Sequence, residues 1–507
     1  MNATKTLSTA WTGDILALIA GALVTLSLAP FDLWPFGIVS TAIIAWLMTD
    51  LAPGQAAKRG WFYGLGLFGS GTSWVYVSIH IHGSAPIPLA AFLTLLFTAL
   101  LALLLSATFF IYSRWLRDKP TGRYLGFAAV LVLGEWFRSW FLTGFPWLLM
   151  GYSHLETPLM GWAPVGGIYT LSFITALTGA VIASGLQQRQ WQIAPIMLVT
   201  LLWLSGAIIS DHHWVSPTDQ QPVKVALVQA NIPQQVKWNA SQYQPTLDLY
   251  QQLSAPLWAT HDLVIWPEAA IPGFYYNARG FFDHISQLSA ANGSSLITGI
   301  PTLQPATADT PYQYHSSIMG FGDGGGIYHK QRLVPFGEYV PLEGILRGLI
   351  TFFDLPMSSF SPGPPNQRGI TAGGLNLAPL ICYEIVYPGL VAEWFPKADM
   401  IVTVSNDAWF GSSIGPLQHL QMAQMRALEN GRYVLRSTST GISAIIDQRG
   451  KIVVSGGQFT REVISGEARV FSGATPFAVY GSWPIVLLSL AICFCCVIIK
   501  PRRLYPS

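Results

Sequence analysis

The chain has 507 residues, enough for two or three domains, but only 10% of them are charged, against about 25% in soluble proteins. A hydrophobic fraction of 51% and 19 tryptophans indicate a membrane protein, because indole rings favour the boundary between hydrocarbon and water. The net charge of +2, without a basic stripe, argues against a nucleic-acid partner. A disulfide framework is not expected, because Cys493, Cys495 and Cys496 share one apolar segment and leave Cys382 without a partner.

Apolar stretches long enough for membrane helices dominate the first 210 residues. A helix needs about 20 mainly apolar residues to cross a bilayer. We predict seven spans, at about residues 14–30, 36–50, 60–80, 86–112, 124–142, 161–186 and 192–210. An eighth, at 482–499, precedes a basic stop at 500–503. The predicted domains are a membrane domain of residues 1–213, a soluble domain of residues 214–473, and a C-terminal span with a basic tail over 474–507.

Lysine and arginine alternate between the two sets of connections around these spans. One set holds nearly all of them, including Lys58, Arg59 and the basic tail, whereas the other holds only Arg138. Short cytoplasmic loops are enriched in these residues. We therefore expect a multi-pass protein of the bacterial inner membrane, with both termini in the cytoplasm and the soluble domain in the periplasm. A cleaved signal peptide is the alternative for the first stretch, but a small-residue cleavage site is lacking and a second span follows almost at once.

The soluble region alternates short apolar strands with amphipathic helices, which is typical of an α/β fold. Helices are expected near 241–257, 278–292 and 416–430. Strands are expected at 223–228, 263–266, 295–300, 377–381 and 400–404. A second strand group near 432–446 and 463–470 predicts a core of two packed sheets covered by helices.

Three segments each place one reactive side chain just after an apolar strand, where α/β folds expose catalytic groups. Glu268 ends the first, Lys330 begins a second that also carries Glu338, and Cys382 ends the third. Taken singly, each has a plain structural alternative: a buried hydrophobic cysteine, a surface lysine, or a carboxylate in a turn or ion pair. Together they provide a base, a cation and a nucleophile.

These segments read WPE, HKQRLVPFGE and ICYE, and with residues 405–411 they resemble the nitrilase superfamily. The whole chain resembles one membrane-bound branch, the bacterial apolipoprotein N-acyltransferases, through residues 143–147, residues 151–152, Lys237-Trp238 and the span layout. This resemblance implies about eight membrane helices plus an αββα sandwich. His315 departs from the family pattern, because relatives tend to carry asparagine there.

The resemblance also implies a reaction. An acyl chain would pass from a phospholipid, such as phosphatidylethanolamine, through a Cys382 thioester to the α-amino group of the N-terminal diacylglyceryl-cysteine of an apolipoprotein. Glu268 would act as general base, and Lys330 would stabilise the oxyanion with the backbone N–H of Tyr383. Lys330 would also favour the thiolate, and Glu338 would hold the site together.

Substrate contacts are expected at Trp238, Trp266, Tyr383 and, less directly, Glu384. Because a thioester retains much of the ester's reactivity, neither a cofactor nor a metal is expected. His80 and His82 are expected in a loop or interface rather than at a metal. Two other readings remain open: a membrane-anchored amidase that uses water as the second nucleophile, and a transporter or scaffold with a degenerate soluble domain.

Overall fold

The computed structural model describes residues 11–119, 121–306, 311–341 and 359–498. The chain forms two compact units. The helical unit comprises residues 1–76, 87–212 and 480–507, and the sheet unit comprises residues 77–86 and 213–479. The segment Val77–Pro86 therefore belongs to the sheet unit, although it lies between two apolar helices in the sequence.

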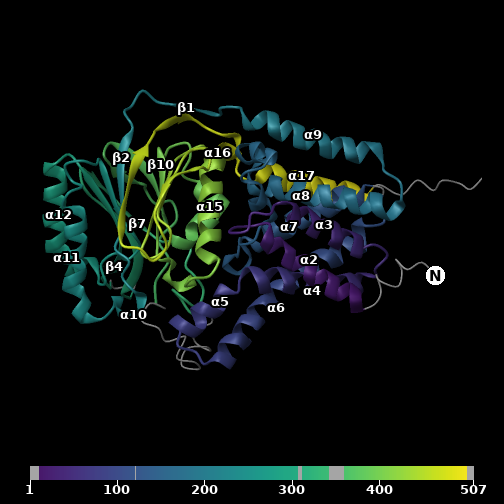
Figure 1. The fold of residues 1–507 in the computed structure, drawn as a ribbon, viewed down its shortest axis with the longest axis horizontal. Coiled ribbons are helices and arrows are strands. Elements are labelled where there is room, and N and C mark those ends of the chain that lie inside the picture. Colours follow the sequence, from purple (N-terminus) through teal and green to yellow (C-terminus); the bar gives the residue numbers. More distant parts are fainter. Residues whose placement is uncertain (1–10, 120, 307–310, 342–358, 499–507) are drawn as a thin grey trace, which may run out of the picture. The chain divides into compact units, whose positions relative to one another are not determined.

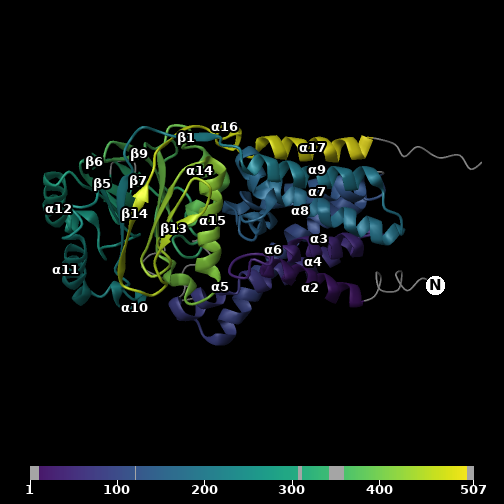
Figure 2. The same ribbon diagram turned by 45° about the horizontal axis from the view of Figure 1, so that its top comes forward.

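A helix occupies each of the eight apolar stretches noted in the sequence. The helices are α2 (Trp11–Leu26), α3 (Pro35–Leu47), α4 (Pro53–Gly71), α6 (Ile87–Ile111), α7 (Phe127–Arg138), α8 (Ala163–Gln188), α9 (Ile193–Ser210) and α17 (Trp483–Ile498), with the short α5 (Trp74–Val77) after α4. Figures 1 and 2 show the axes of α8, α9 and α17 roughly aligned, as in a helical bundle.

Within the described residues, three helical stretches are long and apolar enough to cross a membrane: Ile87–Leu116, Pro158–Gln188 and Ile193–Ser210. Three shorter helices, α2, α3 and α17, are also apolar. The helical unit thus has several candidate spans, and the count of eight stays a prediction.

Two β-sheets form the centre of the sheet unit. In the part of the chain that the structure describes, one sheet has the order β14 (Glu462–Ala468), β2 (Val223–Gln229), β3 (Leu263–Trp266), β4 (Ser295–Gln304), β5 (Gln313–Gly322) and β7 (Ile327–His329). The other has the order β13 (Ile452–Ser455), β12 (Ala444–Ile446), β11 (Val434–Thr438), β10 (Met400–Ser405), β9 (Leu375–Ile381), β8 (Ile370–Ala372) and β6 (Gly324–Gly325). A small ladder pairs β1 (Val215–Pro217) with β15 (Phe471–Gly473).

The two sheets pack face to face. Apolar residues of both, such as Leu227 and Ile265 from one sheet and Val402 and Leu435 from the other, share one buried core. On the outer face of the first sheet, a second core contains residues of α11 (Tyr243–Ser254) and α12 (Arg279–Ala291). Figure 1 shows these helices on one side of the sheets and α15 (Gly415–Asn430) on the other. The expected helix–sheet–sheet–helix arrangement is confirmed.

The predicted strands are confirmed within a few residues at their ends. Their apolar runs are nearly continuous because central parallel strands are buried on both faces. Strands β2, β3 and β4 run parallel in one sheet, and β9, β10 and β11 run parallel in the other. The carboxyl ends of parallel strands lie along one edge of a sheet. Glu268 and Cys382 follow two of these ends, whereas Lys330 follows β7 (Ile327–His329), which pairs antiparallel with β5.

Candidate active site

The structure places each predicted reactive residue directly after a strand. Glu268 lies two residues beyond β3, Lys330 follows β7, and Cys382 follows β9. The first two strands belong to one sheet and the third to the other. The site is therefore assembled from both layers of the sandwich.

Lys330 lies between two carboxylates. Its Nζ is 2.7 Å from Oε1 of Glu338 and 3.5 Å from Oε1 of Glu268. The lysine is 1% exposed, so its charge depends on these two partners. The other oxygen of Glu338 accepts the backbone N–H of Val334 at 2.8 Å, which fixes the carboxylate within its own turn.

Two further groups hold Glu268. Its Oε2 accepts the backbone N–H of Asn406, just beyond β10, at 2.9 Å. Its backbone carbonyl accepts a hydrogen bond from Nζ of Lys237 at 3.4 Å. Lys237 is almost completely buried, and this burial lowers its pKa to about 8, although Glu268 opposes the shift. A second cation thus lies beside the carboxylate.

Cys382 opens a short 3-10 helix, η10 (Cys382–Val386), and is partly exposed. Its φ of +51° lies in the left-handed region, which is unusual for a residue with a side chain and costs free energy. Glu384 helps to hold this turn, because its Oε2 accepts the N–H of Ile381 at 2.8 Å. Such strain is typical of functional sites.

Glu384 also connects the Cys382 turn to the segment around Lys330. Its Oε1 accepts the hydroxyl of Tyr328 at 2.8 Å and the backbone N–H groups of Gln331 and Arg332 at 2.7 and 3.1 Å. Glu384 is completely buried, and burial raises its pKa to about 7. Both oxygens are used in these contacts, so its role in this structure is to join the two segments.

The three central groups perturb one another. Burial raises the pKa of Glu268, while Lys330 opposes the shift. Burial alone would lower the pKa of Lys330, but the carboxylates of Glu338 and Glu268 raise it well above its usual value. Lys330 is therefore a permanent ammonium.

The Cys382 thiol has a strongly raised pKa. Burial and the negative charge of Glu268 raise the pKa of Cys382 to about 12, and Lys330 only partly offsets them. Lys330 lowers the pKa of Cys382, in the direction expected from the sequence, but by less than burial and Glu268 raise it. Without a proton acceptor, Cys382 therefore stays a neutral thiol.

The aromatic residues expected at the substrate differ in exposure. Trp238 is 38% exposed and Tyr383 is 8% exposed. Trp266 is completely buried: its ring packs against Tyr250, and its Nε1 donates to Ser254 Oγ at 2.9 Å. Packing in the outer core therefore accounts for the contacts of Trp266.

His315 lies on β5 and is buried. Its Nδ1 is 2.9 Å from the carbonyl oxygen of Ser361, and its ring centroid is 4.5 Å from that of His329. His315 thus connects residues 359–363 to β5. Strand β5 pairs with β7, the strand that immediately precedes Lys330.

Sequence reasoning missed a buried polar cluster behind Cys382. It consists of Ser405, Asp407, His419 and Arg436, none of them more than 1% exposed. His419 and Arg436 lie in elements predicted from the sequence, but neither residue was assigned a role. The polar residues of α15 leave one apolar sector, as in an ordinary surface helix, so the sequence offers no signal for their burial.

The segment Val77–Pro86 contacts the same region of the sheet unit. The Ser78 hydroxyl donates to the carbonyl of Trp409 at 2.8 Å, and the ring of His82 lies 5.3 Å from that of Trp409. Trp409 belongs to the short helix η11 (Asp407–Phe410) that follows β10. The predicted loop or interface role of His82 thus has a defined partner.

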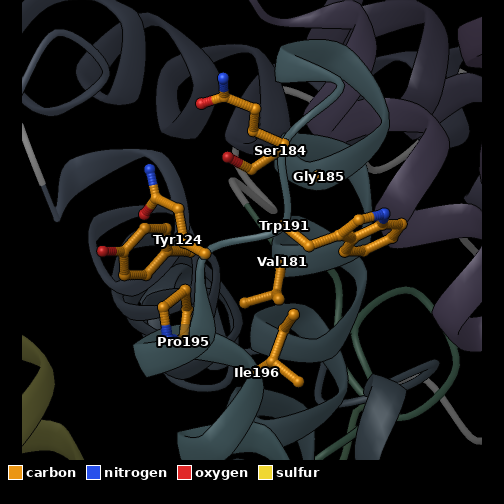
Figure 3. A pocket seen from close by; sticks show the side chains of 9 residues that line it. Tyr124, Val181, Ser184, Gly185, Trp191, Pro195 and Ile196 are labelled. Carbon is orange, nitrogen blue, oxygen red and sulfur yellow. The ribbon is translucent and has the colours of Figure 1, made fainter.

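A small pocket lies in the helical unit, between the ends of α8 and α9 (Figure 3). Its lining includes no charged residue. The lining residues are Tyr124, Val181, Ser184, Gly185, Gln190, Trp191, Gln192, Pro195 and Ile196. The lining has no carboxylate, histidine or lysine that could activate a nucleophile, so the candidate active site remains the cluster at Cys382.

Known proteins share both parts of the chain. Residues 20–181 match the family described as apolipoprotein N-acyltransferase N-terminal domain, and residues 224–470 match the carbon-nitrogen hydrolase family. The apolipoprotein N-acyltransferase of Pseudomonas syringae pv. tomato is 47% identical, over 95% of this chain and 96% of that protein. The corresponding protein of Vibrio parahaemolyticus is 39% identical, over 94% and 95%. The chain therefore belongs to the apolipoprotein N-acyltransferase family.

Proposed function

We propose that this protein N-acylates lipoproteins by moving a fatty acyl chain from a phospholipid through a thioester on Cys382. The acceptor is the α-amino group of an N-terminal diacylglyceryl-cysteine. One observation carries the proposal: a partly exposed cysteine in a left-handed turn lies in the electrostatic field of both the Glu268 carboxylate and the Lys330 ammonium. Family membership and the names of the relatives support the reaction class.

In the first half-reaction, Glu268 accepts the thiol proton as the sulfur of Cys382 attacks the ester carbonyl of the phospholipid. A base is required because the thiol pKa is about 12. The Lys330 ammonium and the Tyr383 N–H bind the oxyanion, a role that typically contributes about 3–4 kcal/mol for each donor. Protonated Glu268 then returns the proton to the leaving alkoxide, giving a lysophospholipid and the acyl-enzyme.

In the second half-reaction, the α-amino nitrogen of the acceptor attacks the thioester carbonyl. Glu268 accepts a proton from this nitrogen and passes it to the departing Cys382 sulfur, so the products are an amide and the free thiol. The two substrates thus use the same base in turn, which is ping-pong catalysis. Glu338 supports both halves by holding Lys330 at 2.7 Å.

Among the predicted substrate contacts, Trp238 and Tyr383 are the better candidates. Trp238 follows the buried Lys237 and keeps an exposed face. Trp266 and Glu384 act indirectly in this proposal, through the core and through the turn of Cys382. We propose phosphatidylethanolamine as the acyl donor and a lipoprotein as the acyl acceptor.

The membrane arrangement belongs to the same proposal. Eight spans, with residues 1–213 and 474–507 in the inner membrane and residues 214–473 in the periplasm, place both termini in the cytoplasm. Helices at all eight apolar stretches support this count. Three of these eight helices, α2, α3 and α17, are apolar but shorter than the three long candidate spans.

Mass spectrometry of the intact protein purified from membranes tests the mechanism. Wild type should carry a fatty-acyl adduct that hydroxylamine removes, and Cys382→Ala should not. A diacylated lipopeptide with a free N-terminus should discharge the adduct, and its N-acetylated form should not. Absence of the adduct from folded wild type refutes the thioester. Discharge by water at the same rate as by the lipopeptide favours the amidase reading instead.

A further inference from the structure

His419 connects the buried polar cluster to the nucleophile. This histidine lies on α15 and has no exposed surface. Its Nε2 is 3.1 Å from the backbone carbonyl oxygen of Cys382. Its Nδ1 is 3.1 Å from Oδ1 of Asp407 and 3.2 Å from a terminal nitrogen of Arg436. The imidazole therefore bridges the catalytic turn and a buried ion pair.

The partners fix which nitrogen carries the proton. A carbonyl oxygen only accepts, so Nε2 of His419 must be the donor to Cys382. Burial and the Arg436 guanidinium lower the pKa of His419, and the Asp407 carboxylate opposes this shift. Nδ1 therefore faces an acceptor, Oδ1 of Asp407, and a donor, Arg436, while Nε2–H stays on the side of Cys382. Asp407 has two further partners: Oδ1 accepts the Ser405 hydroxyl at 2.6 Å, and Oδ2 accepts Arg436 at 2.6 Å.

The carbonyl that His419 holds is one end of the Cys382–Tyr383 peptide group. That group is planar, so fixing the direction of its C=O also fixes the direction of its N–H. A hydrogen bond accepted by the carbonyl also polarises the peptide and strengthens the bond that its N–H donates, by about 10–30% in condensed-phase estimates. This N–H belongs to Tyr383, the backbone donor of the proposed oxyanion site.

We propose that His419 is a positioning residue for the oxyanion site: its Nε2–H aligns and polarises the Cys382–Tyr383 peptide, while Asp407 and Arg436 fix the imidazole. The assignment rests on the proposed function of Cys382. The hydrogen bond from His419 also stabilises the left-handed conformation of Cys382. Such a strained conformation persists only where the surrounding structure imposes it.

The loop that carries Asp407 also positions the proposed base, Glu268. Asn406 donates its N–H to Glu268, and the adjacent Asp407 fixes His419. The loop after β10 thus holds the Glu268 carboxylate directly, and it holds the Cys382–Tyr383 peptide group through His419. A shift of this loop would move both groups together, so the proton acceptor and the oxyanion donor keep their relative positions.

Two matched substitutions separate this role from simple packing. The amide nitrogen of glutamine reaches about as far as Nε2 of histidine, so His419→Gln keeps a donor toward the Cys382 carbonyl. The shorter His419→Asn keeps a polar partner for Arg436 but loses the donor. Each full-length variant is purified in detergent and given phosphatidylethanolamine in mixed micelles. The rate of Cys382 acylation is followed by intact-protein mass spectrometry.

Alkylation of the same thiol by iodoacetamide is the internal control, because that displacement forms no oxyanion. We expect His419→Asn to acylate about 10- to 100-fold more slowly than wild type, as for a weakened oxyanion donor. Its alkylation rate should stay within about threefold of wild type, and His419→Gln should recover most of the acylation rate.

Other results overturn the inference. Equal acylation by wild type and both variants removes the role of the Nε2 donor. A parallel loss of acylation and alkylation in His419→Asn assigns a purely structural role. If His419→Asn does not fold, His419→Gln decides: acylation near the wild-type rate supports the inference, and a selective loss of acylation refutes it. If wild type forms no thioester, the proposed function itself fails.

Discussion

Replacing Glu338 by glutamine removes one of the two carboxylates beside Lys330 while preserving shape. At an effective dielectric constant of about 20, a unit charge attracts the ammonium by about 6 kcal/mol at 2.7 Å and about 5 kcal/mol at 3.5 Å. Loss of the closer partner therefore leaves Glu268 as the dominant attraction. The side-chain oxygen of glutamine still accepts the Val334 N–H, so the local turn is retained.

Two consequences follow for catalysis. The ammonium moves toward Glu268 and away from the oxyanion, and the tighter ion pair lowers the pKa of Glu268, which weakens it as a base. We expect the rate of Cys382 acylation to fall about 10²- to 10³-fold, equivalent to about 3–4 kcal/mol. Removing one partner of a buried pair also costs about 3–5 kcal/mol of folding stability, so unfolding must be measured alongside.

The assay compares thioester formation in wild type, Glu338→Gln and Glu467→Gln by intact-protein mass spectrometry. The last variant makes the same chemical change at an exposed position on β14 and should behave as wild type. A thermal unfolding curve of each variant excludes loss of the folded enzyme. The reasoning is refuted if folded Glu338→Gln acylates at the wild-type rate.

Two further predictions concern protonation and the buried cluster. Because the pKa of Glu268 is raised, acylation should decline as the pH falls through a value above the ordinary 4.5, whereas the Cys382 thiol at about 12 produces no alkaline limb. A rate profile measured between about pH 5 and 9 checks this, and a flat acidic side contradicts it. Asp407→Asn leaves Arg436 buried without its carboxylate and should lower the free energy of unfolding by about 3–5 kcal/mol. Asp283→Asn, in an exposed pair 3.9 Å from Arg279, should change it by less than about 1 kcal/mol.

The sequence predicted the sandwich, and the strand ends that Glu268 and Cys382 follow, for a physical reason. Parallel strands buried on both faces leave continuous apolar runs, and the residue that follows such a run lies at the sheet edge. Glu268 and Cys382 are found this way without knowledge of their contacts. The pairing of Lys330 with Glu338 agrees with the supporting role that the family resemblance implied for Glu338.

The supporting groups could not be predicted in this way. His419, on α15, and Arg436, on β11, are separated from Cys382 by tens of residues, and polar side chains ordinarily indicate solvent exposure. The contact of Ser78 with Trp409 joins positions 331 residues apart. Trp266 shows the converse ambiguity: an aromatic residue beside Glu268 is equally compatible with a substrate contact and with the core, and its ring lies in the core.

The charge pattern explains how one lysine can serve both proposed half-reactions. At rest, Lys330 faces the charge of Glu268 and Glu338, and the thiol is neutral. When Glu268 takes the proton, its negative charge passes to the sulfur and then to the oxyanion, so the number of charges around the ammonium does not change. Because the net charge around the Lys330 ammonium stays constant, the surrounding groups need to reorganise little during the reaction. Such preorganisation is the basis of electrostatic stabilisation. The raised pKa of Cys382 is then an advantage, because the acyl-enzyme cannot begin to form until a carbonyl is present to receive the charge.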